Sequence, residues 1–370
     1  MEASDERPIG GASRERAVLE AIERRRRRRP RMTEERITLA HGSGGRATQA
    51  LIEGLFLPEL TNPLLDPLAD HALFQAPEKV GPRLALSTDA FVVKPLFFPG
   101  GDIGELAVNG TVNDLAMAGA RPLYLSAAFI LEEGFPAADV RRVAASMAAA
   151  ARRAGVAVAA ADTKVVERGK ADGLYVTTAG VAIVETELDL SPAAIRPGDR
   201  IVVSGTLADH GMAIMIARGE LELEAEVESD TAPLHDLVRT LLSATDAVRC
   251  LRDPTRGGLA TIMNELALGA EVAIVLDEAA LPVKPQVLGA CEILGIDPLY
   301  VANEGKLAAV VAPEAAEVAV AVLRSHPLGR DAAVVGEVRA TPQGIVLLET
   351  AFGGTRVVET LVGDPLPRIC

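Results

Sequence analysis

Hydrophobic and polar residues alternate along most of this chain with two different periods. Short apolar runs are typical of strands, and longer segments with an apolar residue every three or four positions are typical of amphipathic helices. The first half predicts strands over 84–93, 123–131, 156–166 and 174–184, and helices over 103–118 and 137–154. The second half predicts strands over 200–204, 272–276, 299–302, 307–311, 332–338 and 344–348, and helices near 209–218, 233–249, 256–268, 285–294 and 313–325. Because both halves mix the two element types, the pattern indicates an α/β or α+β fold.

Three features of the sequence divide the chain into parts. The Arg24 to Arg29 run repels itself and predicts a disordered extension. Ser191-Pro192 and Pro197-Gly198 interrupt the periodic pattern and favour a domain boundary. Two prolines close to the last residue predict a mobile end. The predicted parts are a basic extension over 1–36, an N-terminal domain over 37–190, a C-terminal domain over 191–360 and a flexible tail over 361–370.

Composition and charge exclude several classes of protein. The chain has 370 residues, of which 49% are hydrophobic and 24% charged, as in a globular protein with room for two cores. No apolar run reaches the roughly 20 residues of a membrane span, so no membrane partner is expected. The formal net charge of -14 repels nucleic acid, and a bound nucleotide would need a divalent cation. Few cysteines and no apolar leader indicate the reducing cytoplasm.

Most common cofactor motifs are absent from the sequence. The spacings of the P-loop, the dinucleotide-binding loop and the zinc-binding helix do not occur. A Gly-rich segment from His41 to Gly45 remains, and its glycines can bring backbone N–H groups close to an anion. This segment predicts either a phosphate-binding loop or a plain turn.

Three aspartates occur where side chains can converge on one pocket. Asp89 ends a predicted strand, Asp253 precedes a predicted helix, and Asp114 lies in an apolar helix with Asn109 and Asn113. Strand termination and helix capping would also explain the first two aspartates. Asp114 is harder to explain in that way, because a charge among apolar residues costs free energy unless it is paired or binds a ligand. Oxygen ligands of this kind are typical of Mg²⁺ sites that also hold phosphates.

Two charged residues follow apolar runs. Lys164, in Asp162-Thr163-Lys164, would pair with a phosphate or lie in a solvated loop. Glu304 is predicted to be a general base at a turn between two strands, although turn chemistry alone would explain the adjacent Asn303 and Gly305.

The last residue, Cys370, is a cysteine on the predicted tail. A terminal thiol on an accessible tail can reach other proteins and the chain's own site, although a cysteine there can also be accidental. Cys250 and Cys291 lie beside or in predicted helices and suit buried apolar positions. Cys370 is therefore the candidate carrier of a chemical group.

Taken in order, these segments closely resemble the HypE family, the carbamoyl dehydratases of NiFe hydrogenase maturation. The resemblance covers about residues 37–370, and its most specific part is the closing Pro367-Arg368-Ile369-Cys370. The other matching segments are His41-Gly42-Ser43-Gly44-Gly45, Ser87-Thr88-Asp89, Asn109 to Ala116, Asp162-Thr163-Lys164, Asp253 to Gly258 and Asn303-Glu304-Gly305. Aminoimidazole ribonucleotide synthetase, selenophosphate synthetase and thiamine monophosphate kinase share the fold and the ATP site of this family.

The resemblance implies a fold, a site and partners. The implied N-terminal α/β domain shares a barrel with a second subunit, an α+β domain follows, and ATP and Mg²⁺ bind at the centre of the homodimer. HypF would load a carbamoyl group onto the terminal cysteine, and the cyano group would pass to iron on a HypC-HypD complex. The implied carrier is Cys370, and the implied metal-binding residues are Asp70, Asp89, Asp114 and Asp253. The predicted site also contains Glu304 and Lys164 as catalytic residues, and Gly42, Gly44, Gly45, Asn109, Asn113, Asp162 and Thr163 as ATP-binding residues.

The expected reaction is the ATP-dependent dehydration of a thiocarboxamide on Cys370 to a thiocyanate. The carboxamide oxygen attacks the γ-phosphate, Glu304 takes an N–H proton, and Lys164 with Mg²⁺ offsets the charge on the transferred phosphoryl group. Two alternatives stay open. The chain could be a non-catalytic adaptor that presents a thiol, or another ATP-dependent enzyme such as a selenophosphate synthetase, although the reactive cysteine near the Gly-rich loop of that enzyme is missing.

Overall fold

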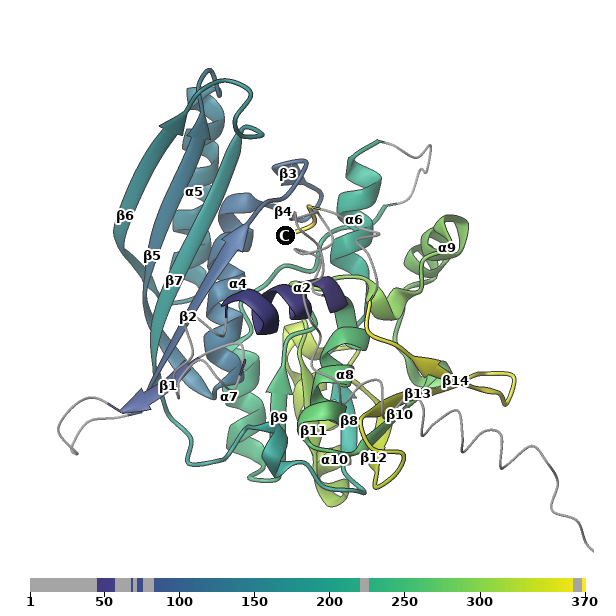
Figure 1. Cartoon of the computed structure of the whole chain (residues 1–370). Coiled ribbons are helices and arrows are strands. Elements are labelled where there is room, and N and C mark those ends of the chain that lie inside the picture. The colour runs from purple at the N-terminus through teal and green to yellow at the C-terminus, as the bar shows by residue number, and fades with distance from the viewer. Residues whose placement is uncertain (1–44, 57–67, 69–71, 76–82, 220–225, 362–367) are drawn as a thin grey trace, which may run out of the picture.

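The computed structural model of this chain describes residues 45–56, 68, 72–75, 83–219, 226–361 and 368–370 (Figure 1). Strands and helices alternate through both halves, so the mixed α/β class that the sequence predicts is confirmed. Within the described ranges, no helix combines the length and apolar character that crossing a bilayer requires.

In the described part of the N-terminal half, five strands form one sheet, and β3 (Phe97–Phe98) and β4 (Gly101–Asp102) pair separately. The order of the five-stranded sheet among the described residues is β1-β2-β7-β5-β6, with β6 at one edge. The strands are β1 (Ala72–Gln75), β2 (Arg83–Phe91), β5 (Ala120–Glu132), β6 (Ala157–Val166) and β7 (Leu174–Val184). Neighbours pair antiparallel, except that β5 and β6 are parallel. A parallel pair needs a crossover, and helix α5 (Ala137–Arg153) supplies it.

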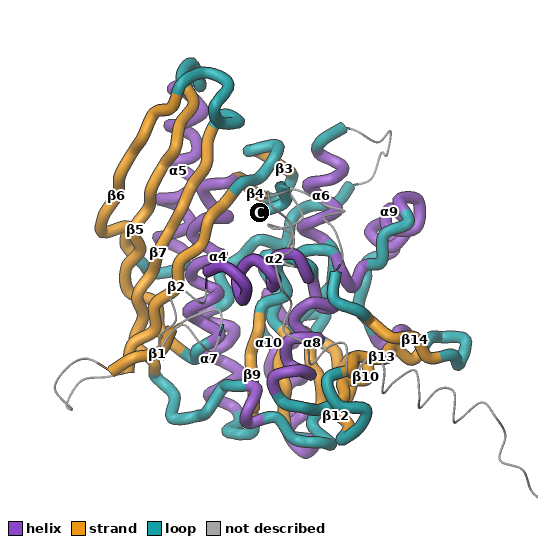
Figure 2. The backbone as a smooth tube through the Cα atoms, in the orientation of Figure 1, coloured by secondary structure: helices purple, strands orange, loops and turns teal. Residues whose placement is uncertain are grey.

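Helices α4 (Ile103–Met117) and α5 cover one face of this sheet (Figure 2). Helix α4 packs on β2, β5 and β7 and is buried along most of its length, while α5 packs on α4 and β6. Asp102 fixes the start of α4, because its Oδ1 accepts hydrogen bonds from Gly104 N and Glu105 N at 2.8 and 3.2 Å. The apolar helix that carries the predicted ligands is therefore held rigidly against β2.

The strands of the C-terminal half form a second sheet. Its order in the described part of the chain is β14-β13-β10-β12-β8-β11-β9. The strands are β8 (Arg200–Val203), β9 (Val248–Arg252), β10 (Ala273–Asp277), β11 (Ala308–Val311), β12 (Ala333–Arg339), β13 (Ile345–Glu349) and β14 (Thr355–Val358). The helices of this half are α6 (Asp209–Ala217), α7 (His235–Ala244), α8 (Gly258–Gly269), α9 (Pro285–Leu294) and α10 (Ala316–Ser325). Shorter elements earlier in the chain are α2 (Arg46–Leu51), the π-helical turn Ile52–Phe56, β3 (Phe97–Phe98) and β4 (Gly101–Asp102).

One apolar cluster joins the two halves. It contains Phe91 and Leu106 from the N-terminal half, Met212 and Val301 from the C-terminal half, and Ile369 from the end of the chain. Burial of such side chains is the main favourable contribution to folding. The two halves and the chain end therefore pack as one unit.

The prediction of a helix over 233–249 is wrong at its C-terminal end. Helix α7 ends at Ala244, and Val248 begins β9. Thr245 is extended, with φ -156° and ψ 139°, which stops the helix. Val248 and Cys250 are buried and pair with β11, so sheet pairing replaces the helical hydrogen bonds.

The prediction of a strand over 299–302 is also wrong. The structure has a 3₁₀ turn at Pro298–Tyr300, in which Asp297 Oδ1 accepts a hydrogen bond from Leu299 N at 2.9 Å. Pro298 favours this start, because its fixed φ suits a helical turn and it lacks the N–H that a strand would use. Glu304 therefore lies in an irregular loop before β11, and not in a turn between two strands.

Candidate active site

The described end of the chain lies beside β3, β4 and α6, between the two halves (Figure 1). Two backbone hydrogen bonds hold it there, from Val92 N to Cys370 O and from Lys94 N to Arg368 O, each 3.1 Å long. Ile369, between these two tail residues, is 4% exposed. The tail residues therefore run alongside the segment that follows β2.

The side chains of Glu304 and Cys370 lie close enough for Glu304 to raise the pKa of the Cys370 thiol. Glu304 is only 3% exposed. Burial raises the pKa of Glu304 well above its ordinary value, and the charges of Asp89, Asp230 and Asp253 raise it further. Burial also raises the pKa of the Cys370 thiol. In this position the thiol stays protonated, while the Glu304 carboxylate, once formed, is a stronger base than an exposed one.

Backbone contacts fix the loop that carries Glu304. Its N–H donates to Asp230 Oδ1, and its carbonyl oxygen accepts from Asn113 Nδ2, both at 3.1 Å. The next residue, Gly305, has no room for a side chain, because a Cβ there would lie 1.8 Å from the Asp230 carbonyl oxygen. Asp230 itself pairs with Lys306 at 3.0 Å. In this structure Asn113, which the resemblance assigns to ATP, holds the Glu304 loop in place.

Arg256 lies among the acidic groups around Glu304. Its Nη2 contacts Asp89 Oδ1 at 3.3 Å. The charges of Cys370, Asp89 and Glu304 raise the pKa of Arg256, so the guanidinium group stays charged. Burial raises the pKa of Asp89, an effect that Arg256 partly offsets. The structure thus places a fixed cation beside the terminal thiol and the buried carboxyl group.

Asp114 and Asn109 also lie close to this cluster. Ser87 Oγ donates to Asp114 Oδ2 at 2.5 Å, which stabilises the carboxylate in an otherwise apolar helix. Asn109 is fully buried, and its Nδ2 donates to Thr231 Oγ1 at 3.1 Å. Its Oδ1 has no hydrogen-bond partner among the described residues. Asn109 therefore retains an acceptor that a ligand could satisfy.

The acidic groups fit a Mg²⁺ ion that is shared with a nucleotide. In the part of the chain that the structure describes, no three His, Cys, Asp or Glu side chains form a metal-binding group. Mg²⁺ usually takes one or two carboxylates and completes its shell with phosphates and water. The repulsion of Asp89 and Asp253 on Glu304 is the setting that a divalent cation relieves. Asp70, the fourth predicted ligand, lies outside the described residues.

Three predicted site residues do not join this cluster within one chain. Asp162, Thr163 and Lys164 lie on the edge strand β6 and are exposed. In the register of β5 and β6, Lys164 pairs with Ile130, which is 38% exposed on the face opposite α4 and α5. Lys164 therefore faces away from the terminal cysteine of its own chain.

The Gly-rich segment is described only at its last residue. Gly42 and Gly44 lie outside the described residues. Gly45 is buried before α2, and a Cβ on it would lie 2.3 Å from the Leu361 carbonyl oxygen. Arg46 N donates to the same oxygen at 3.0 Å. Gly45 thus allows close contact with Leu361, the first residue of the predicted tail, and phosphate binding by this loop stays a prediction.

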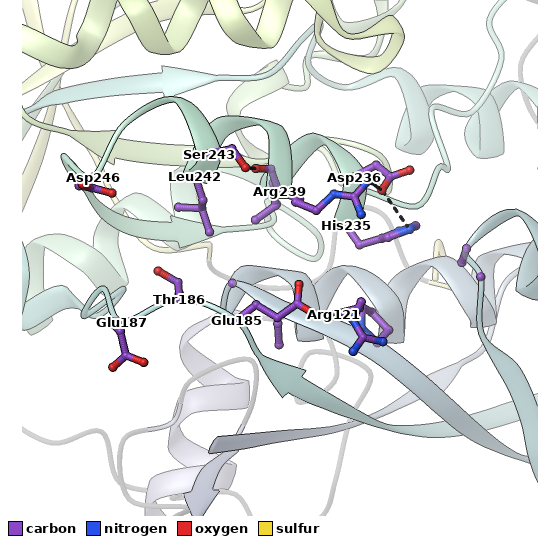
Figure 3. A pocket seen from close by; sticks show the side chains of 16 residues that line it. Arg121, Glu185, Thr186, Glu187, His235, Asp236, Arg239, Leu242, Ser243 and Asp246 are labelled. Atoms are coloured by element: carbon purple, nitrogen blue, oxygen red, sulfur yellow. Dashed lines mark hydrogen bonds and ion pairs between the residues drawn. The ribbon is translucent and has the colours of Figure 1, made fainter. Parts of the chain in front are cut away.

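A cavity of about 660 Å³ lies apart from this cluster, between α7 and the ends of β5 and β7. Figure 3 shows His235, Asp236 and Arg239 on one side of it and Arg121 with Glu185 on the other. The Arg121–Glu185 and Arg239–Asp236 pairs, at 2.6 and 2.7 Å, neutralise much of its charge. Since none of the predicted site residues lines this cavity, it is not the candidate active site.

Comparison with known proteins places this chain in a family. Family models of the AIR synthase related proteins match it twice, the N-terminal domain over residues 69–184 and the C-terminal domain over 196–349. The carbamoyl dehydratase HypE of Cupriavidus necator is 55% identical to it over 335 residues, or 90% of this chain and 95% of that protein. This chain belongs to the HypE family of carbamoyl dehydratases.

Solved HypE structures share the fold of this chain. A HypE–HypF complex matches with a TM-score of 0.79 and 46% identity, over 84% of this chain and 100% of that chain. A HypE structure in complex with ATP matches with a TM-score of 0.75 and 47% identity, over 90% of this chain and 100% of that one. The two family-model matches are separated where the sequence predicts a domain boundary, which stays a prediction.

Sequence reasoning missed three residues of this HypE-family site. Arg256 lies in the same motif as Asp253, and a cation directly after a predicted acidic ligand was the signal for it. Asp230 orients the Glu304 loop, and His210 contacts the chain end through the Ile369 carbonyl. Neither of these two has a local sequence signal, because both act on residues far away in the chain.

Proposed function

We propose that this chain is an ATP-dependent carbamoyl dehydratase of hydrogenase maturation that acts on its own terminal cysteine. The substrate is a thiocarboxamide on Cys370, and the product is a thiocyanate whose cyano group becomes a ligand of iron in NiFe hydrogenases. One observation carries the proposal, namely that the docked chain end holds the Cys370 thiol close enough to the buried Glu304 carboxyl group for Glu304 to raise the pKa of that thiol. Membership of the HypE family and the ATP complex of a relative support it.

The reaction takes two steps on the loaded cysteine. In the first, the carboxamide oxygen attacks the γ-phosphorus of ATP, ADP leaves, and Glu304 takes an N–H proton, which gives an O-phosphorylated imidate on sulfur. In the second, the C–O bond breaks, phosphate leaves, and loss of the other N–H proton forms S–C≡N. Overall, a thiocarboxamide and ATP give a thiocyanate, ADP, phosphate and one proton.

Charge neutralisation at the phosphoryl group comes from two sources. Arg256, in the same chain, lies close enough to Cys370 and Glu304 for these groups to raise its pKa. It therefore offsets negative charge that develops on the phosphoryl group beside them. Mg²⁺, held by Asp89, Asp114 and Asp253 together with ATP phosphates, supplies further neutralisation when bound. Asp70 is proposed to complete this ligand set.

The docked tail supports two separate stages of the reaction. In the docked position the raised pKa of the Cys370 thiol keeps it protonated and weakly nucleophilic. Loading by HypF therefore requires the tail to move outward, where the thiol regains its ordinary pKa. Return of the loaded tail makes dehydration intramolecular. The HypE–HypF complex of a relative supports HypF as partner. Delivery to HypC-HypD rests on the family resemblance, and a cytoplasmic location rests on the few cysteines of the sequence.

A homodimer is the proposed working form. On the face of the first sheet opposite α4 and α5, Leu86 is 45% exposed and Tyr124 55%. Both pair with Val181 in the sheet register, so they form one apolar patch. An exposed apolar face of this kind supports burial against a second copy. Because Lys164 lies on the same face, we propose that it acts at the site of the second subunit.

Lys164→Ala and Glu304→Gln, each inactive alone, should restore activity when they are combined in mixed dimers. If Lys164 acts across the interface, one of the two sites in each mixed dimer has both wild-type residues. Random assortment then recovers about one quarter of the wild-type dehydration rate. The measurement is single-turnover dehydration by co-expressed variants.

The matched control is Glu304→Gln with Cys370→Ala. These two residues lie close together in the same chain, so no site in the mixed dimer regains both, and no activity should return. If the Lys164 mixture also stays inactive, Lys164 acts within its own chain.

The test of the whole function is mass spectrometry of the terminal peptide. After incubation with HypF, a carbamoyl donor and MgATP, the peptide should gain one carbamoyl group and then lose one water as phosphate is released. A non-catalytic adaptor would be loaded without loss of water and without phosphate release that depends on Cys370.

A further inference from the structure

The described tail has every one of its backbone carbonyls held by a hydrogen bond. Lys94 N and Arg218 Nη2 donate to the Arg368 carbonyl at 3.1 and 2.8 Å. Val92 N donates to the Cys370 carbonyl at 3.1 Å. The middle carbonyl is held by a buried side chain, His210. The contact between His210 and the Ile369 carbonyl exists when the tail is docked and is lost when the tail moves outward.

Of the contacts that the His210 side chain makes with the described residues, only the one to the Ile369 carbonyl depends on the position of the chain end. Its Nε2 lies 2.9 Å from the Ile369 oxygen, and its Nδ1 lies 2.7 Å from Ser229 Oγ. The ring is fully buried and packs edge-on against Phe98, with the ring centres 5.6 Å apart. Departure of the tail would leave the Nε2 group without its carbonyl partner, while the Ser229 and Phe98 contacts would remain.

The hydrogen-bond partners fix the tautomer of His210. The Ile369 carbonyl can only accept, so Nε2 carries the proton. Burial lowers the pKa of His210, so the ring is neutral and Nδ1 is an acceptor. Ser229 Oγ then donates to Nδ1 and accepts from Thr231 N at 3.1 Å. The three successive hydrogen bonds donated by Thr231 N–H, Ser229 O–H and His210 Nε2–H therefore all run in one direction, toward the tail.

The same short segment also positions the base. Ser229 orients His210, and the next residue, Asp230, accepts the backbone N–H of Glu304 at 3.1 Å. Asn303, directly before Glu304, accepts from Ala208 N at 2.8 Å, two residues before His210. Two features therefore connect His210 with the Glu304 loop, namely the Ser229-Asp230 segment and the hydrogen bond between Ala208 and Asn303.

We propose that His210, oriented by Ser229, is a positioning residue that holds the terminal cysteine in its docked place through the Ile369 carbonyl. The proposal rests on the proposed function in one respect, that the docked tail is the form that undergoes dehydration. A histidine that merely filled the core would contribute equally with the tail in or out. His210 instead stabilises the docked form selectively, because a contact that exists in only one state shifts the equilibrium toward that state.

The experiment measures how fast a small maleimide alkylates Cys370 in the full chain without nucleotide or partner, by mass spectrometry of the terminal peptide. His210→Leu keeps an apolar body but lacks the donor, and alkylation should be about 3- to 10-fold faster, as expected for the loss of one hydrogen bond. His210→Gln retains an N–H near the Nε2 position and should stay close to wild type. Ser229→Ala, which loses only the orienting hydroxyl, should fall between the two.

Internal and external controls separate the proposal from misfolding. Cys250 and Cys291 are buried and report global opening in the same spectrum, and His326→Leu, after α10, is a matched substitution that should leave the rate unchanged. An unchanged Cys370 rate in His210→Leu, with Cys250 and Cys291 still protected, overturns the proposal. If those two cysteines become reactive, Ser229→Ala decides, and an unchanged Cys370 rate in that variant overturns it as well.

A second readout ties the tail contact to the reaction. Single-turnover dehydration of the pre-loaded His210→Leu protein should be slower, in proportion to the docked fraction that is lost, with unchanged affinity for ATP and recovery in His210→Gln. Equal dehydration rates in wild type and His210→Leu would contradict the positioning role. A wild-type protein that loads but never dehydrates would refute the proposed function, whereas the alkylation experiment would still test the tail contact.

Discussion

Cys370→Ala should lose carbamoyl loading completely and keep its binding of ATP. The substitution removes the only atom proposed to carry the group, so no smaller residual rate is expected. Glu304 keeps its backbone contacts to Asp230 and Asn113, so the site itself should persist without the thiol. Intact mass after incubation with HypF, a carbamoyl donor and MgATP measures loading, and calorimetry measures the affinity for ATP.

Cys291→Ala is the matched control for this prediction. Cys291 is buried in α9, and burial raises its pKa to about 11, so it is a poor nucleophile. The control variant should load like wild type. A carbamoyl adduct on Cys370→Ala, or loss of loading in Cys291→Ala, would contradict the assignment of the carrier thiol.

Local sequence pattern was sufficient for the elements that carry the acidic groups. Strand β2 and helix α4 agree with the predictions within a few residues, because a short apolar strand and an apolar helix capped by Asp102 need no distant partner to be recognised. Asp89 and Asp114 therefore lie where the pattern predicts, at the end of a strand and inside a helix. Their placement beside each other follows from the packing of α4 on β2.

Contacts between distant segments were not predictable in the same way. Glu304 is positioned by Asp230 and Asn113, which are 74 and 191 residues away in sequence. Lys164 follows an apolar run as expected, but which face of the sheet it occupies depends on the register of β5 and β6. A single residue of register moves a side chain to the other face. The face on which Lys164 lies therefore does not follow from the sequence pattern of β6 alone.

The contacts of the tail with distant segments were also not predictable from the sequence pattern. Its prolines predict a chain end that resists pairing, yet the last three residues pair with the segment after β2, and Ile369 enters the shared core. The sign of this in the sequence is an isolated apolar residue between Arg368 and Cys370. Its burial has meaning only once the two halves form a core around it.

Glu304→Gln should slow dehydration by about 10²- to 10⁴-fold and leave carbamoyl loading unchanged. Glutamine matches the size of glutamate but cannot accept the N–H proton, so the variant loses general-base catalysis, which typically contributes this factor. The backbone contacts of residue 304 do not involve its side chain and should persist. Single-turnover dehydration of pre-loaded protein at saturating MgATP separates this step from loading by HypF.

The dehydration rate of the wild-type protein should increase with pH. Burial raises the pKa of Glu304, so the group keeps its proton to a higher pH than an exposed glutamate, and while protonated it cannot act as a base. The wild-type rate should therefore rise with pH through this raised pKa, whereas any residual rate of the glutamine variant should not follow that curve. A wild-type rate that is flat over the same range, or a glutamine variant that keeps the wild-type rate, would remove Glu304 from the role of base.

Stability should change in the opposite direction to activity. A carboxyl group with a raised pKa in the folded state keeps its proton after the unfolded chain has lost it, so the free energy of unfolding falls as pH rises from the ordinary pKa of glutamate to the raised one. The side chain that Glu304→Gln introduces has no proton to lose, so the variant should be at least as stable as wild type at neutral pH, as measured by its melting temperature. A variant that is slower in dehydration yet more stable cannot owe its lost activity to unfolding, which leaves the missing base as the cause.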